Sequence, residues 1–179
     1  MASYYYLIAS LPDLKSDGEM PITYQQFLDM CENAVSAKTY QALKDLDLSS
    51  EEGPVVKEWS KSYGALTQEL NYQRSQRLGK SYPTPQVKEF TITQVVSNAI
   101  AAKNPLEGEK IMLEYQFQLL DSIVGLHMFD DYVLFGYAIK LKLLERQACF
   151  HRDKGEAELR RLMDLVQQRV YRRRMQDYR

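Results

Sequence analysis

Apolar side chains recur at helical spacing through most of this chain and alternate almost nowhere. From Trp59 the steps to Tyr63, Leu66 and Leu70 run four, three and four, which aligns these side chains on one face of an α-helix. Similar stripes occur in residues 91–103, after residue 105, after residue 131 and in residues 156–174. Only residues 87–93 offer a short β-strand alternative. The pattern predicts an all-α, multi-helix bundle.

Helix starts are marked by capping residues. Thr23 followed by Gln26 forms the pattern of a capping box, and the helix that it begins reaches Leu46 if it is continuous. Asn104 and Pro105 fit the N-cap and first position of another helix, with Glu107 completing a second box. Asp130 or Asp131 caps the next helix. These signals place the helix boundaries independently of the apolar stripes.

Glycine and proline divide the chain without splitting its core. Gly79 can close a helix, and Pro83 and Pro85 stiffen the connection that follows. Gly155 is expected to separate the last two helices. At 179 residues the chain is long enough for one core. We therefore expect a single all-helical domain over residues 1–179, with a possible internal boundary at 79–90.

The N-terminal segment from Tyr4 to Leu11 is rich in tyrosine and apolar residues and is expected to be buried against the body. It has no preceding basic region and only about eight apolar residues, too few for a signal peptide or a membrane span. The richest later stretch, residues 111–135, is interrupted by charged residues. These features predict a cytoplasmic protein whose contact with a membrane is indirect.

Charge is distributed unevenly along the chain. Residues 1–150 hold fourteen Lys and Arg against nineteen Asp and Glu, whereas residues 151–179 hold nine against five. A basic last helix can bind a partner, or it can simply present a solvated face. Nucleic-acid binding is not predicted because the sequence pI is about 6.2 and the rest of the chain is acidic.

The sequence carries no recognisable catalytic or metal-binding motif. Neither phosphate-binding loop is found among its eight glycines. His127 and His151 are interpreted as turn and helix-end residues, and Cys31 and Cys149 as small core residues. Adjacent Asp130 and Asp131 suit capping better than acid–base chemistry. We expect no enzyme activity, no cofactor and no metal.

Arginines are the best candidates for contacts with a partner. Arg74 and Arg77 lie three residues apart, so from one helix face both guanidinium groups can bind a partner's carboxylates or an acidic residue of the protein itself. A solvated helix end, where the helix dipole favours basic residues, is the more common reason for such a pair. Arg146 can be paired with a carboxylate inside the bundle. In the basic last helix the candidates are Arg169, Arg172 and Arg173.

Several segments together resemble a known family. They are the tyrosine-rich start that ends at Pro12, Pro21 followed by Phe27-Leu28-Asp29-Met30-Cys31, Asn104-Pro105-Leu106-Glu107, and the stretch from Phe129 to Leu144-Glu145-Arg146. The resemblance is to a small bacterial family encoded among the genes of the V-type (archaeal-type) ATPase. That family is similar to the C (or d) subunit of V-type ATPases, although Tyr132-Val133-Leu134 departs from the asparagine-leucine expected there.

The resemblance implies the fold and role of that C subunit, which is the helical socket between the central rotor shaft and the membrane ring. The chain is then expected to be a non-catalytic subunit or assembly factor in ATP-driven ion transport. Its expected partners are the central-stalk and membrane-ring subunits, and its expected place is cytoplasmic, peripheral to the inner membrane through the complex. The alternative is a free-standing helical interaction or regulatory protein unrelated to the ATPase.

Overall fold

The computed structural model describes residues 4–86, 89–150 and 152–177, without the side chains of 152–154, 156 and 169–177. This described part contains eight helices and no strand, which confirms the all-α prediction. The sequence allowed a short β-strand over residues 87–93, but residues 90–93 are helical, and residues 87–88 lie outside the described part. The chain separates into two compact units, Met1–Gln147 and Ala148–Arg179. Residues 79–90 lie within the first unit.

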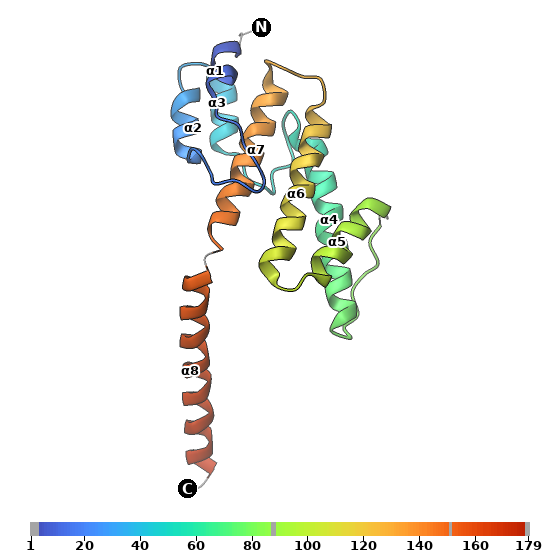
Figure 1. Ribbon diagram of the computed structural model, residues 1–179, viewed down its shortest axis with the longest axis vertical. Helices are drawn as coiled ribbons and strands as arrows, with labels where there is room; N and C mark the ends of the chain where they lie inside the picture. Colours follow the sequence, from blue (N-terminus) through green and yellow to red (C-terminus); the bar gives the residue numbers. More distant parts are fainter. Residues whose placement is uncertain (1–3, 87–88, 151, 178–179) are drawn as a thin grey trace. The chain divides into compact units, whose positions relative to one another are not determined.

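Figure 1 shows the order of the helices. They are α1 (Tyr5–Ser10), α2 (Tyr24–Cys31), α3 (Ala37–Lys44), α4 (Val56–Arg77), α5 (Phe90–Ala101), α6 (Pro105–Val124), α7 (Asp131–Ala148) and α8 (Arg152–Asp177).

The predicted capping box at Thr23 is present, and Asn104 is an N-cap as predicted, although among the described residues Glu107 does not make the reciprocal side-chain contact of a second box. Thr23 and Gln26 form both halves of a capping box. The Asn104 side chain accepts the Glu107 amide hydrogen at 2.9 Å, with Pro105 in the first helical turn. The helix after Thr23 does not continue to Leu46, however. It stops at Cys31, and a new helix begins where the Ser36 hydroxyl accepts the Thr39 amide hydrogen at 3.1 Å.

The larger core joins the N-terminal helices to α7 and to the start of α4. Phe27, Cys31, Trp59 and Leu141 are fully buried in it. The Tyr24 hydroxyl donates to the Leu43 carbonyl at 2.6 Å, which ties α2 to α3. The Tyr137 hydroxyl donates to the Pro12 carbonyl at 3.0 Å, which ties α7 to the segment after α1. Residues far apart in sequence therefore share one core.

A smaller core lies where α4, α5 and α6 pack together. Leu66 on α4, Val96 on α5 and Met112 on α6 are buried there. The α5 and α6 backbones approach closely because residue 108 is glycine. A Cβ atom at Gly108 would lie 2.6 Å from the Ala99 carbonyl oxygen.

The tyrosine-rich N-terminus is docked, but only on one face. Tyr4 and Leu7 are buried, whereas Tyr5 is 49% and Tyr6 is 84% exposed. The reason is that residues 5–10 form a helix, α1, so that successive side chains point in different directions. The expectation that the whole segment is buried was therefore correct for the face that carries Tyr4 and Leu7.

Two further expectations are corrected by the structure. Cys31 is buried, but Cys149 follows the last residue of α7 and is exposed. Gly155 lies within α8, which begins at Arg152, so the separation between the last two helices falls before Gly155. His151 lies outside the described residues. In the part of the chain that is described, no helix combines the length and apolar character needed to cross a membrane.

Candidate partner-binding site

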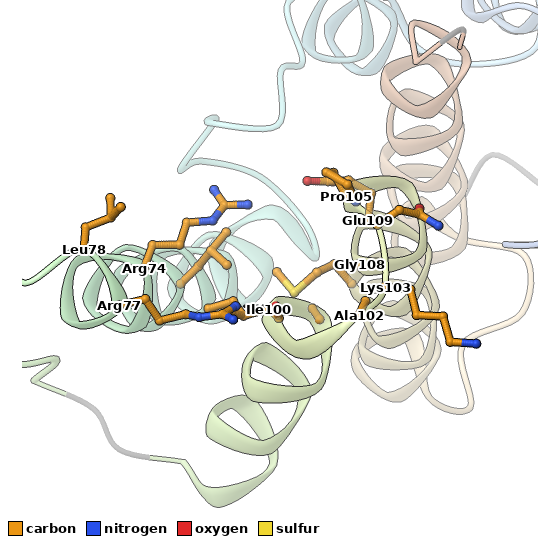
Figure 2. A pocket seen from close by; sticks show the side chains of 13 residues that line it. Arg74, Arg77, Leu78, Ile100, Ala102, Lys103, Pro105, Gly108 and Glu109 are labelled. Atoms are coloured by element: carbon orange, nitrogen blue, oxygen red, sulfur yellow. Dashed lines mark hydrogen bonds between the residues drawn. The ribbon is translucent and has the colours of Figure 1, made fainter.

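A cleft of about 450 Å³ lies beside the smaller core. Its walls come from the last turns of α4, the end of α5 and the first turns of α6, and it contains both predicted arginines, Arg74 and Arg77. Figure 2 shows these arginines leaving α4 on the side that faces α5 and α6. Apolar lining is contributed by Leu70, Ile100 and Met112. The cleft thus combines apolar surface with guanidinium groups.

Arg77 is held by the protein itself. One of its terminal nitrogens, Nη1, donates to the Ile100 carbonyl oxygen at 2.6 Å. That carbonyl belongs to the last turn of α5, where no further helical N–H group is available to bond it. Arg77 therefore caps α5 from α4, and its position is fixed by this contact.

Arg74 is exposed, and among the described residues its side chain has no hydrogen-bond or ion-pair partner. It lies one helical turn before Arg77, so both side chains reach the same cleft. Lys103 also lines the cleft, but Figure 2 shows it extending away from the two arginines. Among the described lining residues, Arg74 is accordingly the guanidinium group that remains available to a partner.

The carboxylate that lines the cleft is already neutralised. Glu109 is the acidic residue among the described lining residues, and its Oε2 accepts from Arg146 Nη2 at 2.9 Å. This contact confirms that Arg146 is paired with a carboxylate of the bundle. Because Glu109 is engaged by Arg146, the cleft keeps a net positive character.

The backbone N–H groups at the start of α6 are largely occupied. Pro105 has no N–H, the Glu107 N–H donates to the Asn104 side chain, and the Gly108 N–H donates to the Asn104 carbonyl at 3.2 Å. A phosphate cradle needs several such groups free to point at the ligand. Anion recognition in this cleft therefore depends on side chains.

A second surface follows α8. Leu159, Leu162, Met163 and Val166 recur at helical spacing and are between 48% and 60% exposed. We call these four residues the α8 stripe. The backbones of Arg169, Arg172 and Arg173 belong to the same helix, but their side chains lie outside the described residues. The structure brings Arg74 and Arg77 together and does not test the three arginines of α8.

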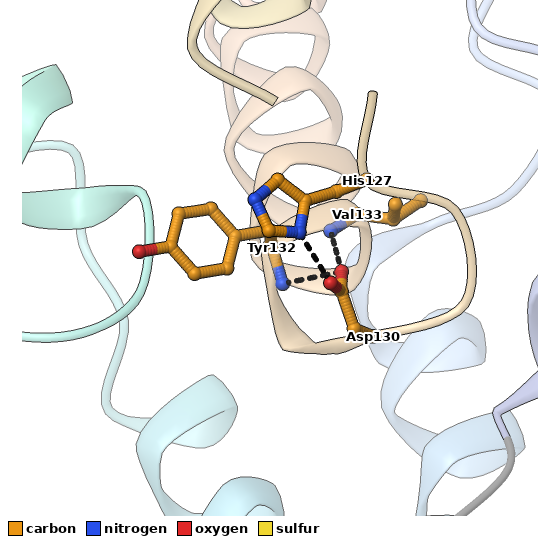
Figure 3. Close-up of polar contacts among 4 residues, drawn as sticks. All are labelled: His127, Asp130, Tyr132 and Val133. Atoms are coloured by element: carbon orange, nitrogen blue, oxygen red, sulfur yellow. Dashed lines mark hydrogen bonds and ion pairs between the residues drawn. The ribbon is translucent and has the colours of Figure 1, made fainter. Parts of the chain in front are cut away.

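The start of α7 is a capping site. Asp130 Oδ1 accepts from the backbone N–H groups of Tyr132 at 3.1 Å and Val133 at 3.3 Å, as Figure 3 shows. The other carboxylate oxygen contacts His127 Nδ1, and the His127 ring stacks on Tyr132 with centroids 4.1 Å apart. These contacts confirm the interpretation of Asp130 as a cap and of His127 as a turn residue. Across the described residues, no three His, Cys, Asp or Glu side chains are grouped as metal ligands.

An exposed aromatic surface near the N-terminus was missed by the sequence analysis. Tyr5 on α1 contacts Phe129 in the loop between α6 and α7, with ring centroids 4.7 Å apart. Leu126 and Met128 in the same loop are 99% and 70% exposed. The helical spacing of the sequence could have predicted this surface. Tyr4, Leu7 and Leu11 share one helix face, which leaves Tyr5 and Tyr6 on the other.

Comparison of the chain with models of protein families, with curated proteins and with solved structures finds no match.

Proposed function

We propose that this protein is a non-catalytic subunit or assembly factor of a V-type ATPase, in which it acts, like the C (or d) subunit, as a link between the central rotor shaft and the membrane ring. Its place is the cytoplasmic side of the inner membrane, to which it is attached through the complex. The choice of complex rests on the resemblance of the tyrosine-rich N-terminus, the Phe27 to Cys31 helix and the Phe129 to Arg146 segment.

The observation that carries the proposal is the exposed α8 stripe. Within the second unit, four large apolar side chains on one face of α8 are about half exposed, and full burial of such a side chain contributes about 1.5 to 3 kcal/mol. A helix of this kind stabilises an assembly when its stripe packs against another helix. In this proposal, the helix that packs against the α8 stripe belongs to a shaft or ring subunit of the ATPase.

The body suits a mechanical role. Its larger core packs Phe27, Trp59 and Leu141 at full burial, and densely packed interiors resist compression. Hydrogen bonds from Tyr24 and Tyr137 fasten the N-terminal segments to the rest of that core. A rigid connector transmits a movement from one partner to another without absorbing it, as coupling of rotation to ion transport requires.

Purification from native membranes tests the proposal. Full-length protein with an affinity tag is expected to recover the shaft and ring subunits. Replacing Leu159 and Met163 by serine removes apolar surface from the α8 stripe and is expected to reduce that recovery by about tenfold or more. Gln168→Ser is the matched control on α8 and should recover the subunits normally. Circular dichroism verifies that all variants keep their helical content.

Two results contradict the proposal. If the tagged protein never recovers shaft or ring subunits, the protein does not belong to the ATPase, and the free-standing interaction protein is favoured. If the subunits are recovered equally well with the substituted stripe, the α8 stripe is not the contact surface.

A further inference from the structure

We propose that the cleft between α4, α5 and α6 binds a short segment of a protein partner in which a carboxylate side chain lies next to an apolar one. The chemistry of this segment follows from the cleft alone. This inference rests on the proposed function only for the identity of the partner, which under the proposed function is a subunit of the ATPase.

Charge identifies one half of the ligand. Arg74 is exposed and lacks a partner among the described residues, and Glu109, the acidic residue of the lining, is paired with Arg146 at 2.9 Å. A guanidinium group donates two parallel hydrogen bonds to a carboxylate, which makes the pairing both strong and directional. An acidic side chain therefore fits the position beside Arg74.

The walls identify the other half. Leu70, Ile100 and Met112 line the cleft, and Leu78 at its edge is 70% exposed. An apolar side chain placed against these residues is removed from water together with part of Leu78. The volume of about 450 Å³ is within the range of sites that bind small ligands or a few side chains.

A free phosphate or nucleotide fits less well. Asn104 occupies the N–H groups of Glu107 and Gly108, Pro105 has none, and Arg77 donates one of its N–H groups to the Ile100 carbonyl. The apolar walls beside Arg74 match a carboxylate with an apolar neighbour better than they match a multiply charged phosphate, which would be partly removed from water against Leu70, Ile100 and Met112.

Arg77 acts here as a positioning residue. Its hydrogen bond of 2.6 Å to Ile100 joins α4 to the end of α5 and so sets the width of the cleft on that side. Arg74, one turn earlier on the same helix, lines the cleft together with the apolar residues of its wall.

Nuclear magnetic resonance with a defined peptide tests the proposal. The probe is a blocked peptide of two glutamates and two leucines, added to the full-length protein with labelled methyl groups and arginine side chains. Saturable shifts are expected at Ile100, Met112 and the Arg74 Nε–H group. A peptide with glutamine in place of each glutamate is expected to bind at least about tenfold more weakly, because it loses the charge-assisted contact.

Variants of single charges locate the contact. Arg74→Glu is expected to weaken binding of the glutamate peptide by about tenfold or more and to leave the fold intact, since Arg74 has no partner among the described residues. Lys110→Glu makes the same charge change on α6 at an exposed position outside the cleft. It is the matched control and should bind the peptide with less than about a twofold change.

The proposal is overturned by absence of saturable shifts, by equal binding of the glutamine peptide, or by equal weakening in both charge variants. Inorganic phosphate that displaces the peptide at equal concentration would identify a simple anion site and would also overturn it. Failure of the proposed function is distinguished from failure of the cleft proposal by combining the two experiments. Peptide binding without recovery of ATPase subunits removes the ATPase as the partner, whereas recovery without peptide binding removes only the cleft.

Discussion

At the scale of single residues, the buried polar groups of the larger core favour their neutral forms. Burial raises the pKa of the Cys31 thiol from 9.0 to about 12. Burial, with the nearby Asp13 charge as a smaller cause, raises the pKa of Tyr137 from 10.0 to about 12. Burial also raises the pKa of Tyr24, which donates to the Leu43 carbonyl. In the unfolded chain these groups ionise at their ordinary values.

The sign of the pH effect follows from these shifts. A pKa that is higher in the folded state means that the folded chain holds the proton more tightly, so stability is complete below the unfolded value and falls as pH rises above it. For Cys31 the fall begins near pH 9 and extends to about 12. For Tyr137 it begins near pH 10. The protein should therefore lose stability in alkaline solution.

Cys31→Ala isolates the thiol. Between pH 8 and 10.5 the free energy of unfolding of the parent protein is expected to fall further than that of the variant, because alanine has no proton to lose. Urea unfolding followed by the fluorescence of Trp59, which is the single tryptophan and is fully buried, measures both. Equal losses in the two proteins would show that folding does not raise the pKa of the Cys31 thiol.

At the scale of helices, two helical glycines allow the effect of close packing to be distinguished from the effect of helix propensity. Gly108 and Gly64 are both helical, in α6 and α4. Alanine is favoured over glycine in a helix by about 1 kcal/mol. At Gly108 the added Cβ would meet the Ala99 carbonyl oxygen at 2.6 Å, whereas at Gly64 nothing lies within 4 Å. The same substitution should have opposite effects at the two sites.

Gly108→Ala is expected to destabilise the protein by about 1 to 3 kcal/mol, because backbone atoms of α5 must move to admit the methyl group. Gly64→Ala is its matched control and should stabilise by about 0.5 to 1 kcal/mol. Urea unfolding of both variants measures the difference. A neutral or stabilising effect at Gly108 would mean that α5 and α6 are not in close contact.

The helix scale is also where sequence reasoning was strongest, for physical reasons. Apolar spacing and local capping residues such as Thr23 and Asn104 act within a few positions, so they are readable from the sequence. Ser36 shows the limit. Its hydroxyl caps the N-terminus of α3, so a new helix starts there and α2 does not continue. The apolar face from Phe27 to Leu46 is nevertheless equally compatible with one continuous helix.

In the candidate site, too, the local features could be predicted from the sequence, whereas the contacts made by tertiary packing could not. The spacing of Arg74 and Arg77 places both on one helix face, which the sequence shows directly. That Arg77 bonds to Ile100 while Arg74 has no partner among the described residues depends on the packing of α5 against α4, which no local pattern encodes.

At the scale of the whole molecule, the two units have different energetic roles. Every residue of the two described cores lies at or before Leu144, and the second unit begins at Ala148. The α8 stripe contributes large apolar side chains that are about half exposed. We therefore expect the first unit to hold the folding free energy and the second to serve association.

Truncation after Gln147 tests this division. The shortened chain is expected to unfold in urea within about 0.5 kcal/mol of the full chain, as reported by Trp59, because it keeps every described core residue. Recovery of partners from membranes should fall at least as far as with the substituted α8 stripe, because the whole stripe is removed. A chain that aggregates or unfolds at much lower urea would instead show that residues 148–179 complete the core, and the exposed stripe would then be a surface used in folding.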